Sequence, residues 1–503
     1  MGFLYRIEEL RALEARARAG LAPGALMQRA GRAAAAHLHT RLRQRVGTQR
    51  AGTVLLLCGP GDNGGDGFVC AAALRELGHD CRCWAPAAST RPDAVAARAH
   101  WQASGGEIHA QLPTQMKPDI VVDALFGIGA QRPLADPFLG ALRAAQALGV
   151  PIVALDVPSG LHADTGAWIG AVAGVRAATT LTFLGDKPGL HMLDARDAAG
   201  TVEVHSLQTD ALQAQAPPGG ALIEPDQFGV LGQARAARSN KGDFGTVSVV
   251  GGAAGMVGAA LLAARAALRL GAGKVIVDCI GAPGLAVDLL QPELMLRPGA
   301  AIAPGSTLVA GCGMGSDAAA SERLVGLLAH EGPALFDADA LNCIAATPQL
   351  QQRLAARSQT TVITPHPGEA ARLLSCATPD VQTDRIASAL RLARQTNAIV
   401  VLKGAGSVVA QPDGHYAVNP TGSAALASAG TGDVLAGMIG ALLAQSAVGL
   451  PAAIAAVHAG VWLHGRAAEL FAQDSGMSAS EIAPLAARAL AQLRCAGRPA
   501  RLD

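Results

Sequence analysis

A glycine-rich turn that opens a long apolar helix is the strongest chemical signal in the sequence. Residues 429–444 read AGTGDVLAGMIGALLA, so Asp433 directly follows the turn Gly430 to Gly432. The backbone N–H groups of this turn could stabilise charge that develops on a transferring phosphoryl group, while Asp433 could accept the proton of the attacked hydroxyl. The alternative is that Asp433 only caps a helix after a glycine turn. We favour an anion site with an adjacent base.

A second glycine-rich turn lies in the first half of the chain. The segment GPGDNGGDG, residues 59–67, directly follows an apolar run and precedes a helical stretch, which is the setting in which glycine turns receive phosphate. Its five glycines let N–H groups approach an anion without obstruction by Cβ atoms. Plain strand-to-helix turns also use glycine, but the additional Asn63 and Asp66 favour a functional site.

Two further carboxylates end apolar runs in the same half. Asp123 stands in VVDALFGIGAQRP, and Asp156 stands in LDVPSG with Ser159 three residues later. The carboxyl ends of parallel strands share the edge of the sheet where ligands bind, so we expect these three side chains near the 59–67 turn. The alternative is that each aspartate merely caps the helix that follows it.

The elements that must position these residues alternate along the chain. Short runs rich in Val, Ile and Leu alternate with Ala-rich helical stretches, which predicts the α/β class with parallel sheets covered by helices. In the first half we expect strands at 54–58, 119–125, 151–157 and 179–183. In the second half we expect them at 246–250, 274–280, 307–311, 360–365 and 398–404.

Length and composition indicate two globular domains. The chain has 503 residues, of which 50% are hydrophobic and 16% charged, so it can bury more than one ordinary core. The segment 214–221 is rich in Pro, Gly and Ala and separates the two alternating patterns, which predicts domains at 1–213 and 222–503 with a linker between them. A formal net charge of +1 gives no field that favours nucleic acid or an anionic membrane.

The cysteines, the N-terminus and one uncharged segment bear on the compartment. The nine cysteines lack zinc-ribbon or C-x-x-C spacing, which favours reduced thiols in cytosol. The N-terminus lacks the apolar stretch of a signal peptide, so we expect a cytoplasmic protein. Residues 434–457 are uncharged and long enough to span a membrane, but Gln445, Ser446 and Gly449-Leu450-Pro451 divide them. We therefore predict two buried helices there.

The motifs of the first half resemble the NAD(P)HX epimerase domain, over about residues 1–213. The resemblance rests on the 59–67 turn, the strand end D with FGxG at Asp123, and the D-V-P-S-G turn at Asp156. It implies a Rossmann-like three-layer domain with Asp156 in the acid/base role. It also implies a potassium ion held by Asn63, Asp123 and Ser159, and oxygen ligands suit such a hard cation. The substrate contacts that it implies are Asp62, Asn63, Gly64, Gly65, Asp66, Gly127, Ile128, Gly129, Ala130, Gln131, Arg132, Pro133 and Asp156.

One position of the first turn departs from that pattern, because Asp62 stands where the family usually has asparagine. A carboxylate beside a pyrophosphate is unfavourable, since two charges ~4 Å apart interact by roughly 4 kcal/mol near a protein surface. We therefore expect Asp62 to face solvent or the cation.

Six ordered blocks of the second half resemble the NAD(P)HX dehydratase domain of the ribokinase-like superfamily, over about residues 222–495. The blocks are 241–273, 311–315, 337–342, 364–369, 401–409 and 419–433. The block GCGMG carries Cys312 where proline is commoner. The resemblance implies that an adenine nucleotide contacts Lys403, Gly404, Ala405, Gly406, Ser407 and Gly432. It implies that the hydrated nicotinamide nucleotide contacts Ala259, Gly313, His366 and Asp433.

Together the two resemblances imply a bifunctional repair enzyme for hydrated NADH and NADPH, with Asp156 and Asp433 as catalytic residues. The first domain would interconvert the (R) and (S) epimers of NADHX and NADPHX. The second would dehydrate the (S) epimer with ADP and Mg²⁺, giving NAD(P)H, AMP and phosphate. We expect a homo-oligomer that binds neither nucleic acid nor membrane. Two alternatives stay open: a ribokinase-like kinase for a vitamin precursor, and a first half that is only a nucleotide-binding module.

Overall fold

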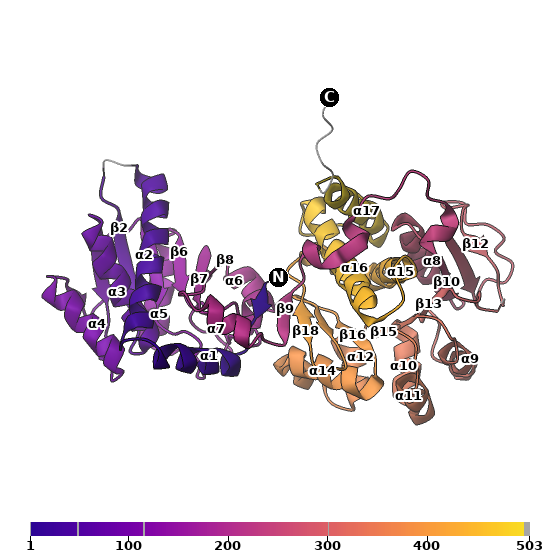
Figure 1. Ribbon diagram of the computed structural model, residues 1–503, viewed down its shortest axis with the longest axis horizontal. Coiled ribbons are helices and arrows are strands. Elements are labelled where there is room, and N and C mark those ends of the chain that lie inside the picture. The colour runs from indigo at the N-terminus through magenta and orange to yellow at the C-terminus, as the bar shows by residue number, and fades with distance from the viewer. Residues whose placement is uncertain (1, 48–49, 114–115, 300, 497–503) are drawn as a thin grey trace. The chain divides into compact units, whose positions relative to one another are not determined.

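The computed structural model describes residues 2–47, 50–113, 116–299 and 301–496, and their contacts define two compact units (Figure 1). Residues 3–220 form the N-terminal unit, and Gly2 belongs with the residues from Ala221 onward to the C-terminal unit. The segment 214–221, predicted as a linker, contains the end of helix α7 and the start of strand β9. Within the described ranges, no helix combines the length and the hydropathy needed to cross a membrane.

The N-terminal unit is built on a parallel sheet with the strand order β4-β3-β2-β5-β6-β7-β8. The order reverses at β2, so the carboxyl ends of β2 and β5 flank the crevice where open α/β sheets bind ligands. The strands are β2 (Thr53–Cys58), β3 (Asp80–Trp84), β4 (Ile108–His109), β5 (Ile120–Ala124), β6 (Ile152–Leu155), β7 (Thr179–Phe183) and β8 (Thr201–His205).

Helices cover both faces of this sheet because its central strands bury side chains on both sides. In β2, Val54 and Leu56 face the core that α1 to α4 complete, whereas Leu55 and Leu57 face the core that α5 completes. The helices are α1 (Ile7–Ala19), α2 (Ala25–Val46), α3 (Asp62–Glu76), α4 (Pro92–Ala103), α5 (Phe138–Ala147), α6 (Ala195–Ala198) and α7 (Asp210–Gln215).

The sheet of the C-terminal unit has the order β9-β18-β17-β16-β15-β14-β13-β10-β11-β12. We expected parallel pairing throughout, but β16, β17 and β18 pair antiparallel, because the short connections between them can join only antiparallel neighbours. The strands are β9 (Gly220–Leu222), β10 (Thr246–Gly251), β11 (Lys274–Cys279), β12 (Met295–Leu296), β13 (Thr307–Ala310), β14 (Ala334–Phe336), β15 (Thr361–Ile363), β16 (Ile399–Leu402), β17 (Val408–Ala410) and β18 (Tyr416–Val418).

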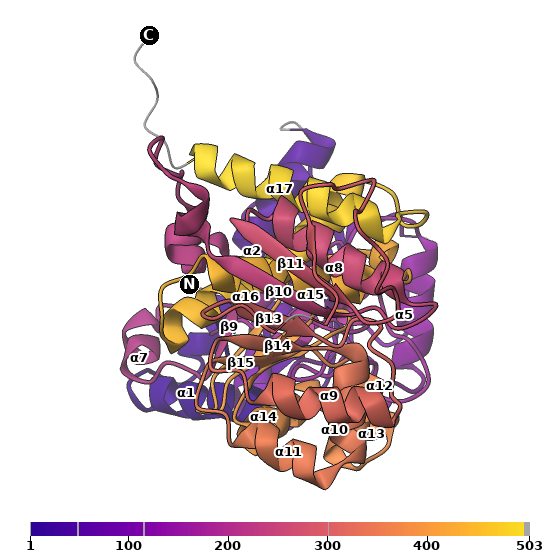
Figure 2. The ribbon, with the colours of Figure 1, turned by 90° about the vertical axis from the view of Figure 1, so that its right-hand side faces the viewer.

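Helices α8, α15, α16 and α17 pack on one face of this sheet, and α9 to α14 lie on the other (Figure 2). The uncharged segment 434–457 falls in α15 and α16, which are separate helices of the core, as the sequence predicts. The helices are α8 (Val257–Arg269), α9 (Ala318–Leu328), α10 (Ala338–Ala346), α11 (Pro348–Ala355), α12 (Pro367–Leu374), α13 (Thr378–Thr383), α14 (Arg385–Thr396), α15 (Thr431–Ala444), α16 (Leu450–Phe471) and α17 (Ala479–Ala496).

Candidate active sites

Three side chains of the C-terminal unit meet after β13, after β14 and at the start of α15. The ligand atoms of Cys312, Asp337 and Asp433 all lie within 4.8 Å of one another. Burial and the charge of Asp337 raise the pKa of Asp433 to about 6, although a hydrogen bond from Cys312 opposes this shift. Asp433 is therefore a carboxyl group that can accept and release a proton close to neutral pH.

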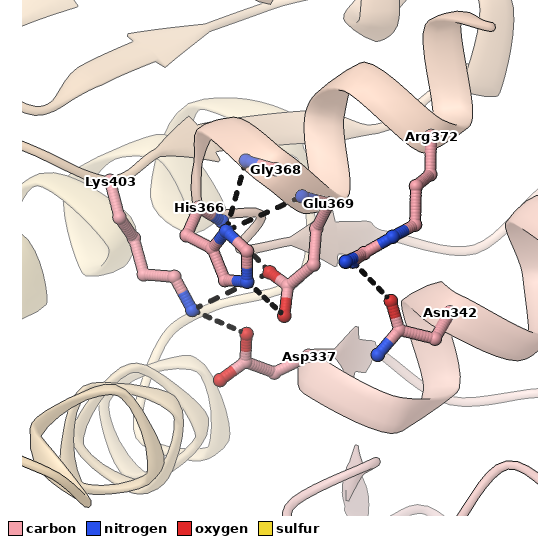
Figure 3. A network of polar contacts seen from close by, with 7 residues as sticks. All are labelled: Asp337, Asn342, His366, Gly368, Glu369, Arg372 and Lys403. Carbon is pink, nitrogen blue, oxygen red and sulfur yellow. Dashed lines mark hydrogen bonds and ion pairs between the residues drawn. The ribbon is translucent and has the colours of Figure 1, made fainter. Parts of the chain in front are cut away.

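Lys403 brings the loop after β16 into contact with this group. Its Nζ atom lies 2.7 Å from Oδ1 of Asp337 and 4.0 Å from Oε2 of Glu369 (Figure 3). Burial disfavours the charged ammonium, but the charges of Asp337 and Glu369 outweigh burial and raise the pKa of Lys403. A Cβ atom added to Gly432 would lie 3.3 Å from Lys403 Nζ. The structure thus brings together two predicted nucleotide contacts, Lys403 and Gly432, beside Asp433.

His366 is linked to Lys403 through Glu369 (Figure 3). The Nδ1 atom of His366 accepts the N–H groups of Gly368 and Glu369 at 3.0 and 3.3 Å and so caps helix α12. Because Nδ1 accepts, the proton is on Nε2, which lies 3.2 Å from Oε1 of Glu369. Burial disfavours the Glu369 carboxylate, but this hydrogen bond and the charge of Lys403 together lower its pKa. The half-exposed ring of His366 therefore has a fixed orientation.

Hydrogen bonds from Ser407 within the loop and from a buried arginine stabilise the loop Lys403–Ser407. Gly404 N–H donates to Ser407 Oγ at 3.2 Å, and that hydroxyl donates to Gly404 O at 3.1 Å. The buried Arg385 donates to the carbonyls of Leu402 and Lys403 at 3.1 and 3.2 Å. The sequence analysis missed Arg385, because an arginine that opens a helix looks like an ordinary surface residue.

Hydrogen bonds to backbone carbonyl groups stabilise two glycine turns of this unit. The Nε2 atom of His464 lies 2.9 Å from Thr431 O, and burial lowers the pKa of His464 to about 4, so the neutral ring donates this bond. In the GCGMG turn, Gly252 N–H donates to Cys312 O at 2.9 Å. Gly313 has φ +59°, and a Cβ atom added to it would lie 2.9 Å from Ala259 Cβ. The predicted contacts Gly313 and Ala259 are therefore neighbours.

In the N-terminal unit, Asp123 and Ser159 form a buried pair. Ser159 donates its backbone N–H to Asp123 Oδ2 at 2.8 Å and its hydroxyl to Oδ1 at 2.7 Å. Burial raises the pKa of Asp123, and these hydrogen bonds offset only part of that effect. Asn63 donates its Nδ2 to Leu155 O at 3.2 Å, at the carboxyl end of β6. Its buried Oδ1 has no hydrogen-bond partner among the described residues, so this oxygen is available to a cation.

A pocket of about 410 Å³ adjoins this pair at the reversal of strand order. Two predicted substrate contacts, Gly64 and Gly65, do not line this pocket, and their backbones are closely packed: an added Cβ would lie 1.9 Å from Gly59 O or 2.5 Å from Met27 Cε, respectively. Gln131, Arg132 and Pro133 are exposed, and none of the three lines this pocket. The predicted contacts that do line it are Asp62, Asn63, Asp66, Gly127, Ile128, Gly129, Ala130 and Asp156.

The carboxylate of Asp156 points into this pocket from a left-handed backbone conformation with φ 66°. Its Oδ2 accepts Ile128 N–H at 2.8 Å, and its Oδ1 lies 2.9 Å from Nζ of Lys187. Lys187 was not predicted; the available signal was a lone lysine shortly after an apolar strand. Asp62 lies in the pocket wall, where its charge acts on Arg18 and Asp66. Burial and the charge of Asp156 raise the pKa of Asp66 well above its usual range.

The N-terminal α/β unit has a carboxylate-lined pocket where the strand order reverses, and the C-terminal α/β unit has the carboxylates of Asp337 and Asp433 beside a glycine turn. Together these features are the architecture of a two-domain enzyme. A sequence model of the family described as NAD(P)H-hydrate dehydratase matches residues 247–490, and that of the YjeF-related protein N-terminus matches residues 23–189. The chain belongs to the family of bifunctional NAD(P)H-hydrate repair enzymes, because relatives across its length carry that name. The family and the α/β class predicted from the sequence are confirmed.

Two of these relatives cover most of the chain. The bifunctional NAD(P)H-hydrate repair enzyme Nnr of Escherichia coli (strain K12) is 37% identical over 432 residues, which span 84% of this chain and 81% of that protein. The enzyme Nnr of Gloeobacter violaceus is 38% identical over 477 residues, which span 90% of each chain. A solved ADP/ATP-dependent NAD(P)H-hydrate dehydratase from Bacillus subtilis, co-crystallised with ATP/Mg²⁺, is 29% identical with a TM-score of 0.46; the match covers 54% of this chain and 98% of that one.

Proposed function

We propose that this chain repairs hydrated NADH and NADPH in two reactions, one at each site. The N-terminal unit interconverts the (R) and (S) epimers of NADHX and NADPHX, and the C-terminal unit dehydrates the (S) epimer with ADP. The observation that carries the proposal is the position of Asp433. Its carboxylate lies at the start of α15, next to the carboxylate of Asp337 and close to Lys403 and Gly432. A carboxylate beside a cation and a glycine turn supports phosphoryl transfer to a hydroxyl, which needs a proton acceptor and groups that stabilise the phosphoryl charge.

In the dehydratase reaction, Asp433 accepts the proton of the C6 hydroxyl as the terminal phosphoryl group of ADP is transferred to that oxygen. The N–H groups of the Gly430–Gly432 turn and the ammonium of Lys403 stabilise the charge on the phosphoryl oxygens. Phosphate then leaves C6 with the electrons of the C–O bond, C5 loses a proton and the C5–C6 double bond forms, so the products are NAD(P)H, AMP, phosphate and a proton. The carboxylates of Asp337 and Asp433 have the oxygen donors that suit Mg²⁺, which would neutralise phosphate charge when bound.

In the epimerase reaction, Asp156 exchanges a proton with the substrate in the pocket of the N-terminal unit. Asn63, Asp123 and Ser159 offer oxygen atoms to K⁺, and the unpartnered Oδ1 of Asn63 supports this assignment. A bound K⁺ would supply a fixed positive charge near the substrate phosphates. The pocket residues Asn63, Asp66 and Gly127 to Ala130 would contact the substrate.

The decisive experiment is incubation of the full chain with a mixed-epimer NADHX preparation and ADP. We expect complete recovery of absorbance near about 340 nm, a property of the reduced nicotinamide, together with release of free phosphate. Asp433→Asn should abolish recovery, whereas Asp156→Asn should let it stall when the (S) epimer is consumed. A stable phosphoester product would instead identify a vitamin-precursor kinase, and full recovery by Asp156→Asn would reduce the N-terminal unit to a binding module.

The cellular compartment, the kind of ligand and the oligomeric state are also part of the proposal. The nine cysteines form no disulfide among the described residues, which supports a reducing, cytoplasmic setting. The balance of charges supports small-molecule substrates in preference to nucleic acid or a membrane surface. The proposed state is a homo-oligomer, which sedimentation analysis of the purified chain tests.

A further inference from the structure

Lys187 is a buried cation whose donors all point at protein oxygens of the N-terminal unit. Its side chain is 1% exposed. Its Nζ atom lies 2.6 Å from Thr182 Oγ1, 3.1 Å from Phe183 O and 3.2 Å from Gly185 O, besides 2.9 Å from Asp156 Oδ1. An ammonium has three N–H donors, so these four oxygens use all of them. Lys187 therefore has no donor left for a substrate.

A buried ammonium is unfavourable unless a negative charge lies beside it, and here that charge is Asp156. The other oxygen of Asp156 accepts Ile128 N–H at 2.8 Å, so both oxygens have fixed donors. The backbone contributes as well: Asp156 has φ 66°, and a Cβ atom added to Gly127 would lie 2.2 Å from Asp156 Oδ2. The carboxylate thus has one orientation, with its open side toward the pocket.

We propose that Lys187 is a positioning residue that supplies the positive charge beside Asp156 and keeps its carboxylate aimed into the pocket, so that Asp156 starts the epimerase cycle as a proton acceptor. Asp156 takes the proton of the C6 hydroxyl as the C6–N1 bond breaks, which leaves a carbonyl at C6 and the electron pair on N1. When N1 attacks the opposite face of this carbonyl, the C6–N1 bond forms again and Asp156 returns the proton to the oxygen, so no proton is consumed. The inference rests on the proposed epimerase function and adds to it the direction of the first proton transfer.

The charges around the pocket explain why a buried lysine is needed. Asp62 and Asp66 also line the pocket, and Lys187 is a cation in direct contact with the carboxylate of Asp156. Burial and the charge of Asp156 raise the pKa of Asp66 well above its usual range, which makes Asp66 the poorer proton acceptor of the two. The other charged residues that line the pocket are Arg11, Glu14, Arg18 and Arg91.

The test uses the full chain with three variants and follows interconversion of NADHX epimers from pH 5 to pH 10. Lys187→Met should lower the rate near neutral pH by about 100-fold, the usual contribution of a positioned acid or base. This loss should shrink as pH rises, because the cation that was removed favours a carboxylate over its protonated form. Lys187→Arg keeps the charge and should keep the pH midpoint of the wild type. Thr182→Val removes a neutral partner of Lys187 and should keep the shape of the wild-type profile.

Circular dichroism and thermal unfolding of the same molecules report whether the N-terminal unit of each variant is folded, and dehydratase turnover reports the amount of intact chain. An unchanged rate and pH profile for Lys187→Met would overturn the inference, and so would an equal loss at every pH, which is the mark of a structural role. If Lys187→Met does not fold, Lys187→Arg decides, because a shifted pH midpoint there contradicts the proposal. A wild-type chain that does not interconvert epimers at all would sink the proposed function itself, a different outcome from these.

Discussion

Asp337 binds Lys403 through one carboxylate oxygen, Oδ1, at 2.7 Å, while its other oxygen lies on the side of Gly432. This ion pair neutralises much of the positive charge that would otherwise act on Asp433. The pKa of Asp433 is accordingly raised, by burial first and by Asp337 second, and the charge of Lys403 offsets only part of the shift. The pair therefore fixes both the nucleotide loop and the proton affinity of the proposed base.

The pH dependence of dehydration should report this proton affinity. Asp433 acts as a base only when ionised, so kcat/KM should fall as pH decreases through about 6, by about tenfold at pH 5. Cys312→Ala removes a hydrogen bond that lowers the pKa, so its midpoint should move to higher pH. Cys376→Ala serves as the control, because this thiol lies outside the site. A wild-type midpoint near the ordinary aspartate value would contradict the assignment.

Arg385 should affect the nucleotide more than the chemistry. Arg385→Gln removes the charged donor beneath Leu402 and Lys403, and a hydrogen bond from a charged group contributes ~1.5–3 kcal/mol. We expect the KM for ADP to rise by roughly 10- to 100-fold with a smaller change in kcat. Arg357 is a matched control, because it is also buried and also donates to backbone carbonyls, at Leu328, His330 and Gly332. An equal KM change in Arg357→Gln would assign the effect to stability alone.

The rate of epimer interconversion should depend on K⁺, and this dependence should require the unpartnered Oδ1 of Asn63. Epimer interconversion should rise with added KCl at an ionic strength held constant with choline chloride. In Asn63→Ala the K⁺ concentration for half-activation should increase by about 10- to 100-fold, as for other losses at a metal site. Dehydratase turnover of the same chain gives the control. Equal rates with and without K⁺ in the wild type would remove potassium from the mechanism.

The close approach of α8 and α15 should make one glycine irreplaceable. A Cβ atom added to Gly437 would lie 1.9 Å from Ala263 O, so Gly437→Ala should lower the free energy of unfolding by about 1–3 kcal/mol through overpacking. Gly326 in α9 has nothing within 4 Å of an added Cβ, and Gly326→Ala should instead stabilise the chain by up to ~1 kcal/mol. Denaturant midpoints measure both changes, and similar values for the two variants would refute the packing argument.

Strand positions could be predicted from the sequence because the central strands are buried on both faces. The expected runs at 54–58 and 246–250 correspond to β2 and β10, and the other seven expected strands are also present. Strands such as β3 and β8 escaped notice, since they alternate apolar with charged residues and are partly exposed. The strand ends Asp123 and Asp156 share one edge, as parallel pairing requires.

Site residues that act through other residues could not be predicted in the same way. Lys187, Arg385 and His464 contact Asp156, Lys403 and Thr431, respectively. No recognisable sequence motif links each residue to its partner, because the fold brings them together from separate segments. The glycines of the first turn have a second role that the sequence did not reveal. Neighbouring atoms fill the space where a Cβ of Gly64 or Gly65 would stand, so both positions also require glycine for packing.

Helix α15 buries every residue from Val434 to Leu443, so its axis has no freedom to shift within the core. Asp433 and the N–H groups at the first turn of α15 are consequently held in one fixed arrangement. By contrast, the ring of His366 is half-exposed and Gly404 and Ala405 are exposed, so movement on nucleotide binding is expected in these segments and not in α15.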